Sequence, residues 1–246
     1  MIEYLLSAAM AIGPALGYID QYFIIKRQQS SSGFNPVTCA ILLFSNIVRI
    51  FFWFGKRFDT TLLIQSAVMI ITQSILLETV VRHRTPEKHE SEPLKDQQQS
   101  RRRRFYDTFW QWPHYLDYVN CLLGFTTVVG VAYVLLGKLP WFVEALGIIS
   151  LGIESTLPLP QCISNFKTRS TAGFSLIVLA TWFLGDAFKL FYFIYTNAPL
   201  QFDLCGAIQL SIDSLIVMQS ILFSTKVKTW LGIHPHPDKH LYESIP

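Results

Sequence analysis

The sequence predicts an all-α membrane protein in which seven transmembrane helices form two three-helix units joined by a single helix. Of the 246 residues, 51% are apolar and only 15% are charged, and the mean hydropathy is +0.34. A soluble domain carries nearer a quarter of charged residues. The apolar residues lie in long runs of about 20 residues, the length that a helix needs to cross a bilayer. This composition leaves no room for a large soluble domain.

Seven spans are predicted in order along the chain, at residues 4–25, 35–55, 61–82, 116–137, 141–165, 173–195 and 203–225. The first is expected to be a retained helix, because no small-residue cleavage pattern follows its apolar run. Residues 4–82 form a first three-helix repeat, residues 141–225 form a second, and the helix at 116–137 joins them. Residues 83–115 are expected to be a largely disordered loop with a basic and aromatic end, and residues 226–246 form a tail.

Basic residues predict the orientation of the chain, because connections on the cytosolic side of a membrane are rich in lysine and arginine. Lys26 and Arg27 follow the first span, four consecutive arginines stand at residues 101–104, and further lysines lie in the tail. The alternate connections hold few basic residues. The amino terminus is therefore predicted to be lumenal or extracellular, whereas the long loop and the tail are predicted to be cytosolic.

An internal repeat relates the two halves. Shifting residue 18 onto residue 158 aligns residues 18–54 with residues 158–194 without a gap. The matches fall at turn and intramembrane positions: Gln21 with Gln161, Gly33 with Gly173, Phe34 with Phe174, Asn46 with Asp186 and Arg49 with Lys189. A three-helix unit has its ends on opposite sides of the membrane, so two units share one orientation only if an odd number of helices joins them. The fourth span supplies this inversion, which predicts a 3+1+3 arrangement with parallel repeats.

A Pro-Gln pair, Pro160 and Gln161, ends the fifth span, and a basic turn then leads to Gly173 and Phe174. This pattern resembles the PQ-loop repeat family, whose signature is a Pro-Gln pair near the cytosolic end of the first helix of each repeat. The resemblance implies a SWEET-like fold of parallel repeats. It also implies a hinge, or carbonyl groups that line a cavity, at both equivalent places, although Asp20 replaces the proline in the first repeat. The residues concerned are Pro14, Asp20, Gln21, Pro158, Pro160 and Gln161.

Further segments resemble one branch of this family, that of the fungal antagonist-of-flippase proteins and the animal PQ-loop repeat-containing proteins. They are residues 46–55, 109–112, 185–189 and 198–202, together with the long loop after the third span. The resemblance implies a protein of Golgi and endosomal membranes that opposes phospholipid flippases by letting phospholipids equilibrate between the two leaflets.

Charged residues inside the predicted spans are the main candidates for a site. A charged side chain near the middle of a bilayer costs roughly 2.5–3.5 kcal/mol, so such groups are usually paired, exposed to water or functional. Asp186 and Lys189 share one face of the sixth span, and Asn46 and Arg49 take the equivalent face of the second span. Two interpretations stay open: self-neutralising pairs that fix helix packing, or a polar path lined by both repeats.

Other polar residues add to this candidate path, namely Glu154, Gln65, Gln209 and Asp213. Gln65 and Gln209 are predicted to occupy matching positions in the third helix of each repeat. Asp213 has no partner nearby on its own helix, so it is expected to meet Lys189 or Arg49 across the bundle or to be protonated. A purely structural role for Asp213 is equally open.

No cofactor and no metal ion are expected. The four cysteines stand singly in apolar runs, which argues against a zinc site or a disulfide framework. The sequence His-Pro-His-Pro in the tail holds its histidines in an extended segment rather than in a metal site. There is no glycine-rich phosphate loop and no Ser-His-Asp arrangement, so neither an ATP-driven pump nor a hydrolase is supported.

Three functions are compatible with these features. The first is an energy-independent phospholipid scramblase, in which a polar groove carries the head group while the acyl chains stay in the bilayer. The second is a proton-coupled exporter of a small solute such as a cationic amino acid, with Asp186 or Asp213 as the proton acceptor. Against it, Lys189 and Arg49 would repel a cationic substrate. The third is a trafficking adaptor that acts through the cytosolic loop and tail.

The tail also contains a possible sorting signal. Tyr242 and Ile245 fit the pattern of a tyrosine followed by a bulky apolar residue that clathrin adaptors bind in an extended conformation. The alternative is that both residues belong to a disordered tail. A sorting role would agree with the trans-Golgi and endosomal location that the resemblance implies.

Overall fold

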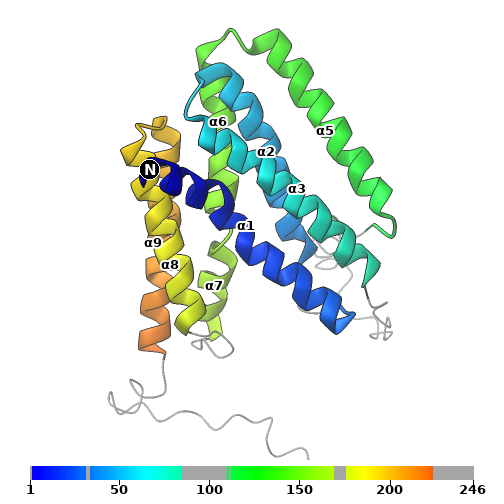
Figure 1. Cartoon of the computed structure of the whole chain (residues 1–246), viewed down its shortest axis with the longest axis vertical. Helices are drawn as coiled ribbons and strands as arrows, with labels where there is room; N and C mark the ends of the chain where they lie inside the picture. Colours follow the sequence, from blue (N-terminus) through cyan, green and yellow to red (C-terminus); the bar gives the residue numbers. More distant parts are fainter. Residues whose placement is uncertain (1, 32–33, 85–109, 111, 169–175, 224–246) are drawn as a thin grey trace, which may run out of the picture.

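The computed structural model of the chain describes residues 2–31, 34–84, 110, 112–168 and 176–223 (Figure 1). The described residues form helices and short connections without a strand, in agreement with the predicted all-α class. The helices are α1 (Ile2–Gln28), α2 (Pro36–Lys56), α3 (Thr60–Arg82), α5 (Tyr115–Leu136), α6 (Pro140–Ser155), α7 (Leu159–Thr168), α8 (Leu176–Tyr195) and α9 (Leu200–Leu222).

The helices have the length and apolar character of membrane spans. Six segments meet both criteria, namely Glu3–Gln28, Pro36–Lys56, Thr60–Arg82, Tyr115–Leu136, Pro140–Thr168 and Leu200–Leu222. α8 has 20 residues and completes the second repeat as the counterpart of α2. The chain is a multi-pass membrane protein.

Local sequence explains where α2 begins and ends and why α3 follows it after a tight connection. The side chain of Asn35 accepts a hydrogen bond from the Val37 amide at 3.0 Å and caps the start of α2. α2 ends where Arg57 adopts a left-handed conformation with φ of 50°. Two residues later Asp59 caps α3 by accepting from the Thr61 amide at 2.6 Å. α2 and α3 therefore run antiparallel as neighbours.

The helix boundaries reproduce the sequence repeat. The shift that takes residue 18 to residue 158 also applies to the third helix of each repeat. It takes both ends of α3, Thr60 and Arg82, to both ends of α9, Leu200 and Leu222. The predicted 3+1+3 arrangement is confirmed, with α1 to α3 as the first repeat, α5 as the joining helix and α6 to α9 as the second repeat.

The first helix of each repeat differs between the two. The fifth span was expected to be one helix at 141–165, but the structure divides it into α6 and α7 at a turn of residues 156–158. Pro158 explains the break, because a proline disfavours helical geometry in the preceding residue and has no amide hydrogen to donate. Pro160 lies in the first turn of α7, where that missing hydrogen is tolerated. α1 continues through Pro14 and changes direction along its length (Figure 1).

Within each repeat the third helix packs against both others: α3 contacts α1 and α2, and α9 contacts α8, α6 and α7. The two repeats meet along two seams that the internal symmetry relates. In one seam α2 packs along α6, and in the other α1 meets α8. The connections at residues 57–59, 137–139 and 196–199 lie at the upper end of Figure 1, and α1, α3 and α9 finish toward the lower end. α5 lies outside the first repeat, against α2 and α3.

The end of the long loop is inserted into the first repeat. This loop was expected to be largely disordered with a basic and aromatic end, but the Trp110 side chain is 0% exposed. Its ring packs against Phe44 of α2 at 5.2 Å and Tyr118 of α5 at 5.0 Å, measured between ring centroids. The Tyr118 hydroxyl donates to the backbone carbonyls of Trp110 and Trp112. Residues 85–109, the greater part of this loop, lie outside the described residues.

Candidate functional site

Glu154 of α6 is the centre of a charged cluster at the interface of the two repeats. Its carboxylate forms an ion pair with the Arg49 guanidinium of α2. The other carboxylate oxygen accepts a hydrogen bond from Lys189 Nζ of α8 at 3.1 Å. Arg49 and Lys189 are equivalent positions of the two repeats, so one carboxylate binds the matching cations of both.

The cluster extends from Lys189 to α9. Gln209 accepts from Lys189 Nζ at 3.4 Å and donates to the Asp186 carboxylate at 2.7 Å. Asp186 Oδ1 lies 3.9 Å from Lys189 Nζ, one turn away on the same helix. The Asp213 carboxyl lies beside that of Asp186 and within electrostatic range of Lys189. Three carboxyl groups and two cations therefore share one region of the membrane interior.

The members of the cluster differ in accessibility. The Arg49 side chain is 2% exposed, whereas those of Glu154, Lys189 and Asp186 are 11%, 13% and 17% exposed. Arg49 is locked in the protein interior by its ion pair. The α8 side of the cluster is therefore more exposed than its α2 side.

Two predicted residues of the first repeat do not join this cluster. Asn46 is buried and donates to the Leu42 carbonyl of its own helix at 2.8 Å. Gln65 is buried in α3, and its side-chain oxygen has no hydrogen-bond partner among the described residues. The expected match of Gln65 with Gln209 is also wrong. Because α3 and α9 begin at Thr60 and Leu200, the residue of α9 equivalent to Gln65 is Cys205.

Gln73 is the residue of α3 that corresponds to Asp213, and sequence analysis overlooked it. The helix boundaries place both at the same distance from the start of their helices. The Gln73 side chain is fully buried and neither of its amide atoms has a partner in the described part of the chain. Extending the repeat alignment beyond residue 54 would have found this pair. The first repeat therefore carries amides, Asn46 and Gln73, where the second carries the carboxyls of Asp186 and Asp213.

In the described part of the chain, the predicted hinge residues form no hydrogen bond or ion pair with the charged groups. Gln161 donates to Asn165 at 2.7 Å, one turn further along α7. In α1, Asp20 is exposed and Gln21 is half-buried. Tyr18, which corresponds to Pro158, approaches the cluster instead and lies within electrostatic range of Glu154 and Asp186.

At the upper end, matching contacts close both seams between the repeats. The Phe52 ring of α2 fits against Gly147 of α6, where a Cβ would lie 2.7 Å from the ring. The equivalent residues are Tyr192 of α8 and Ser7 of α1, whose hydroxyls are hydrogen-bonded at 3.2 Å. The same two positions of the repeats thus meet in both seams. In one seam an aromatic ring packs on a glycine, and in the other two hydroxyls are hydrogen-bonded.

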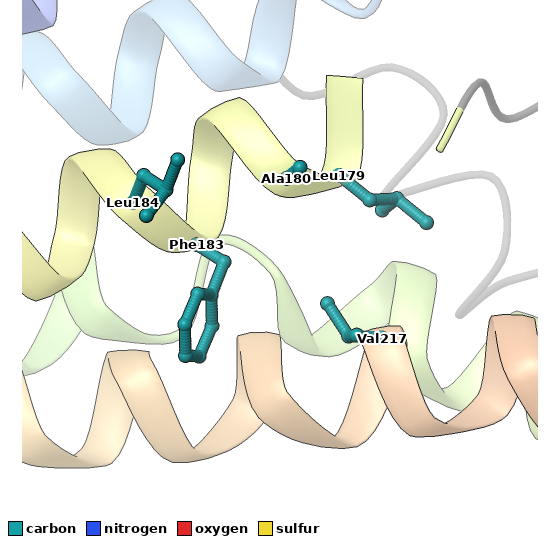
Figure 2. Close-up of a pocket in the computed structure, with 5 residues that line it drawn as sticks. All are labelled: Leu179, Ala180, Phe183, Leu184 and Val217. Carbon is teal, nitrogen blue, oxygen red and sulfur yellow. The ribbon is translucent and has the colours of Figure 1, made fainter. Parts of the chain in front are cut away.

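Apolar pockets lie elsewhere on the molecule. One has a volume of about 400 Å³ and is lined by Leu179, Ala180, Phe183 and Leu184 of α8 and by Val217 of α9. Figure 2 shows Phe183 directed from α8 toward α9. A second pocket lies between α2, α3 and α5. All the described residues that line the first pocket are apolar.

The described residues contain no group of three or more histidine, cysteine or acidic side chains that could hold a metal ion. All four cysteines are free. The proposed sorting residues Tyr242 and Ile245 lie outside the described part of the chain.

Sequence comparison supports the resemblance found above. The family model for the PQ loop repeat matches residues 142–202, which include most of α6 and the whole of α7 and α8. Scramblase ANY1 of Saccharomyces cerevisiae is 26% identical, in an alignment that covers 90% of this chain and 71% of the yeast protein.

Structure comparison supports the fold. A solved structure of a eukaryotic SWEET transporter matches with a TM-score of 0.53, covering 90% of this chain and 94% of the transporter. The two are 14% identical, so this match shows the fold alone. The predicted SWEET-like arrangement is confirmed.

Proposed function

Because this chain belongs to the PQ-loop repeat family and is a distant homologue of yeast scramblase ANY1, we propose that it is a phospholipid scramblase. It would let phospholipids equilibrate between leaflets without an energy source and so oppose the flippases. We choose lipid over other substrates because the yeast relative is named as a scramblase. The charged cluster at the repeat interface is the structural observation that carries the proposal.

The chemistry of this cluster suits a phospholipid head group. A head group combines a phosphate with an amine or hydroxyl groups, and it cannot cross hydrocarbon alone because burying an unpaired charge is costly. The Lys189 ammonium would pair with the phosphate, and the Asp186 carboxylate would pair with a head-group amine. Both groups are held in place, Lys189 by Glu154 and Asp186 by Gln209. Arg49 has a supporting role, because its ion pair keeps Glu154 oriented.

The cellular setting is a further part of the proposal. The distribution of basic residues favours a lumenal amino terminus and a cytosolic carboxyl terminus, so the upper end of Figure 1 would face the lumen. The resemblance favours trans-Golgi and endosomal membranes. Clathrin adaptors at Tyr242 and trafficking proteins at the loop of residues 83–115 are the proposed partners on the cytosolic side.

Purified protein in liposomes tests the activity. Labelled phospholipid is incorporated in both leaflets, and an impermeant reductant added outside destroys the label that reaches the outer leaflet. Scrambling without ATP exposes nearly all of the label, whereas an adaptor or a solute exporter leaves the inner leaflet protected. That second result, from correctly folded protein, would contradict the proposed function.

Variants of the cluster test the site. We expect Asp186→Asn and Lys189→Gln to slow scrambling, since each removes a charge that the head group would contact. Each single change also alters the net charge of the cluster by one, even though Glu154 still pairs with the cations that remain, and an unbalanced buried charge is destabilising. The double variant is therefore measured as well, at matched thermal stability. Asp117→Asn on α5 is the control, because Asp117 is exposed and lies outside the cluster.

A further inference from the structure

One face of α8 is buried at its upper end and exposed below. Tyr192, Phe188 and Gly185 are spaced by four and three residues, so they follow one another on one side of the helix. Tyr192 is buried against Ser7 of α1, and Phe188 packs against the same apolar cluster. Gly185 is exposed, and among the described residues no atom lies within 4 Å of the position that a Cβ would take there.

One face of α1 changes in the same way. Leu6, Met10, Gly13 and Gly17 are spaced by four, three and four residues and share one side of the helix. Leu6 and Met10 belong to the apolar cluster that contains Tyr192 of the second repeat. Gly13 and Gly17 are exposed, and a Cβ at either would meet nothing within 4 Å. Figure 1 shows α1 and α8 close together near their upper ends and running apart below.

The charged cluster lies beside this opening. Asp186 directly follows Gly185, and the Tyr18 side chain, one residue after Gly17, lies within electrostatic range of both Asp186 and Glu154. Leu157 of the turn between α6 and α7 packs with the apolar group that includes Ala15 of α1. A molecule between α1 and α8 at this level would therefore touch the accessible side of the cluster.

We propose that phospholipid enters the site laterally, between α1 and α8 in the lower half of the bundle. Gly13, Gly17 and Gly185 leave the space through which the head group passes from the lower leaflet to Lys189 and Asp186. The acyl chains stay outside, in the bilayer. The hydrogen bond of Ser7 with Tyr192 marks the upper limit of this portal. The inference rests on the proposed scramblase function and specifies the path of its substrate.

The equivalent seam between α2 and α6 is closed to such a molecule. Cβ atoms built at Gly55 and Gly147 would lie 2.5 Å from Val143 and 2.7 Å from Phe52, so these side chains already fill the space beside both glycines. Below them the ion pair of Arg49 with Glu154 joins the two helices. A head group on this side would have to separate a buried ion pair, which the α1–α8 portal does not require.

Pro14 explains why the α1–α8 seam stays open. It stands at the position of α1 that corresponds to Glu154 in α6, so Lys189 finds no carboxylate there and binds Glu154 of its own repeat. A proline inside a helix also bends it, and α1 changes direction along its length (Figure 1). The two residues at this position of the repeat therefore have opposite effects: Glu154 closes the α2–α6 seam, and Pro14 leaves the α1–α8 seam open.

Bulky side chains in the portal provide the test. We expect Gly185→Trp and Gly17→Trp to slow scrambling in liposomes by at least about tenfold, equivalent to about 1.4 kcal/mol in the barrier. Gly124→Trp on α5 is the matched control and should scramble at the wild-type rate, since Gly124 is also exposed with nothing within 4 Å. Portal variants as active as this control would overturn the inference. Wild-type protein without scrambling activity would instead contradict the proposed function.

A second measurement does not depend on scrambling. Phosphatidylethanolamine with a photoactivatable group on its head group is added to liposomes containing the protein, and cross-linked peptides are identified by mass spectrometry. We expect cross-links on α8 around Gly185 and on α1 around Gly17, and their loss in Gly185→Trp. Cross-links confined to α2 and α6, or unchanged by the tryptophan, would overturn the proposed portal.

Discussion

The seam of α2 with α6 and the seam of α1 with α8 are built from equivalent parts of the two repeats, yet only the first is closed along its length. Both are closed at the upper end, by Phe52 on Gly147 in one and by Tyr192 on Ser7 in the other. Below this level the first continues through the ion pair of Arg49 with Glu154. The second has exposed glycines at the same depth.

This difference shows how two repeats of the same fold can form an asymmetric site. Two identical repeats would present the same opening, or the same closure, on both sides of the molecule. One carboxylate, present in the second repeat and replaced by Pro14 in the first, attracts both cations to one place. The asymmetry of the site thus follows from one position of the repeat, and it can be tested by changing each seam separately.

The largest effect is expected from the ion pair of the closed seam. Glu154→Gln leaves the Arg49 charge unpaired in the protein interior and should lower the free energy of unfolding by about 3–5 kcal/mol. Thermal or denaturant unfolding of the protein in detergent measures this loss. Glu144→Gln is the control in the same helix, because the Glu144 and Lys56 side chains are 39% and 41% exposed and such a pair contributes about 1 kcal/mol or less. Equal losses in both variants would show that the Glu154 pair does not hold the seam.

A smaller effect is expected from filling the glycine under Phe52. Gly147→Leu would force its side chain into the Phe52 ring and should cost about 1–3 kcal/mol of stability through overpacking. Gly185→Leu in the open seam has space for the new side chain, so its stability should not fall. If both leucine variants unfold alike, then the two seams are not packed differently.

The smallest effect concerns the upper contact of the open seam. Tyr192→Phe removes the hydroxyl that interacts with Ser7 at 3.2 Å and Asp59 at 3.5 Å, and should cost about 0.5–1.5 kcal/mol. The double variant Ser7→Gly with Tyr192→Phe reproduces the aromatic-on-glycine contact of the closed seam. We expect a double-mutant cycle in unfolding to show that the two changes are not additive, because both remove the same hydrogen bond. Additive losses would mean that Ser7 and Tyr192 act independently.

The sequence alone determined most of the fold. Apolar runs of membrane-spanning length and the internal repeat predicted seven spans in a 3+1+3 order, because a bilayer accepts only helices whose backbone groups bond internally. The repeat also predicted that Arg49 and Lys189 occupy equivalent places, and the cost of burying charge identified Asp186, Glu154 and Asp213 as candidates for the site.

Only the tertiary structure decided which of these groups meet and where the protein is open. Spacing along one helix suggested Asp186 as the partner of Lys189, but the distances favour Glu154, which lies on another helix and also binds Arg49. The burial of Trp110 and the open lower half of the α1–α8 seam were not predicted either. The physical reason is the same for both, since each depends on how distant helices pack, and the sequence of one helix does not reveal what its neighbours leave uncovered.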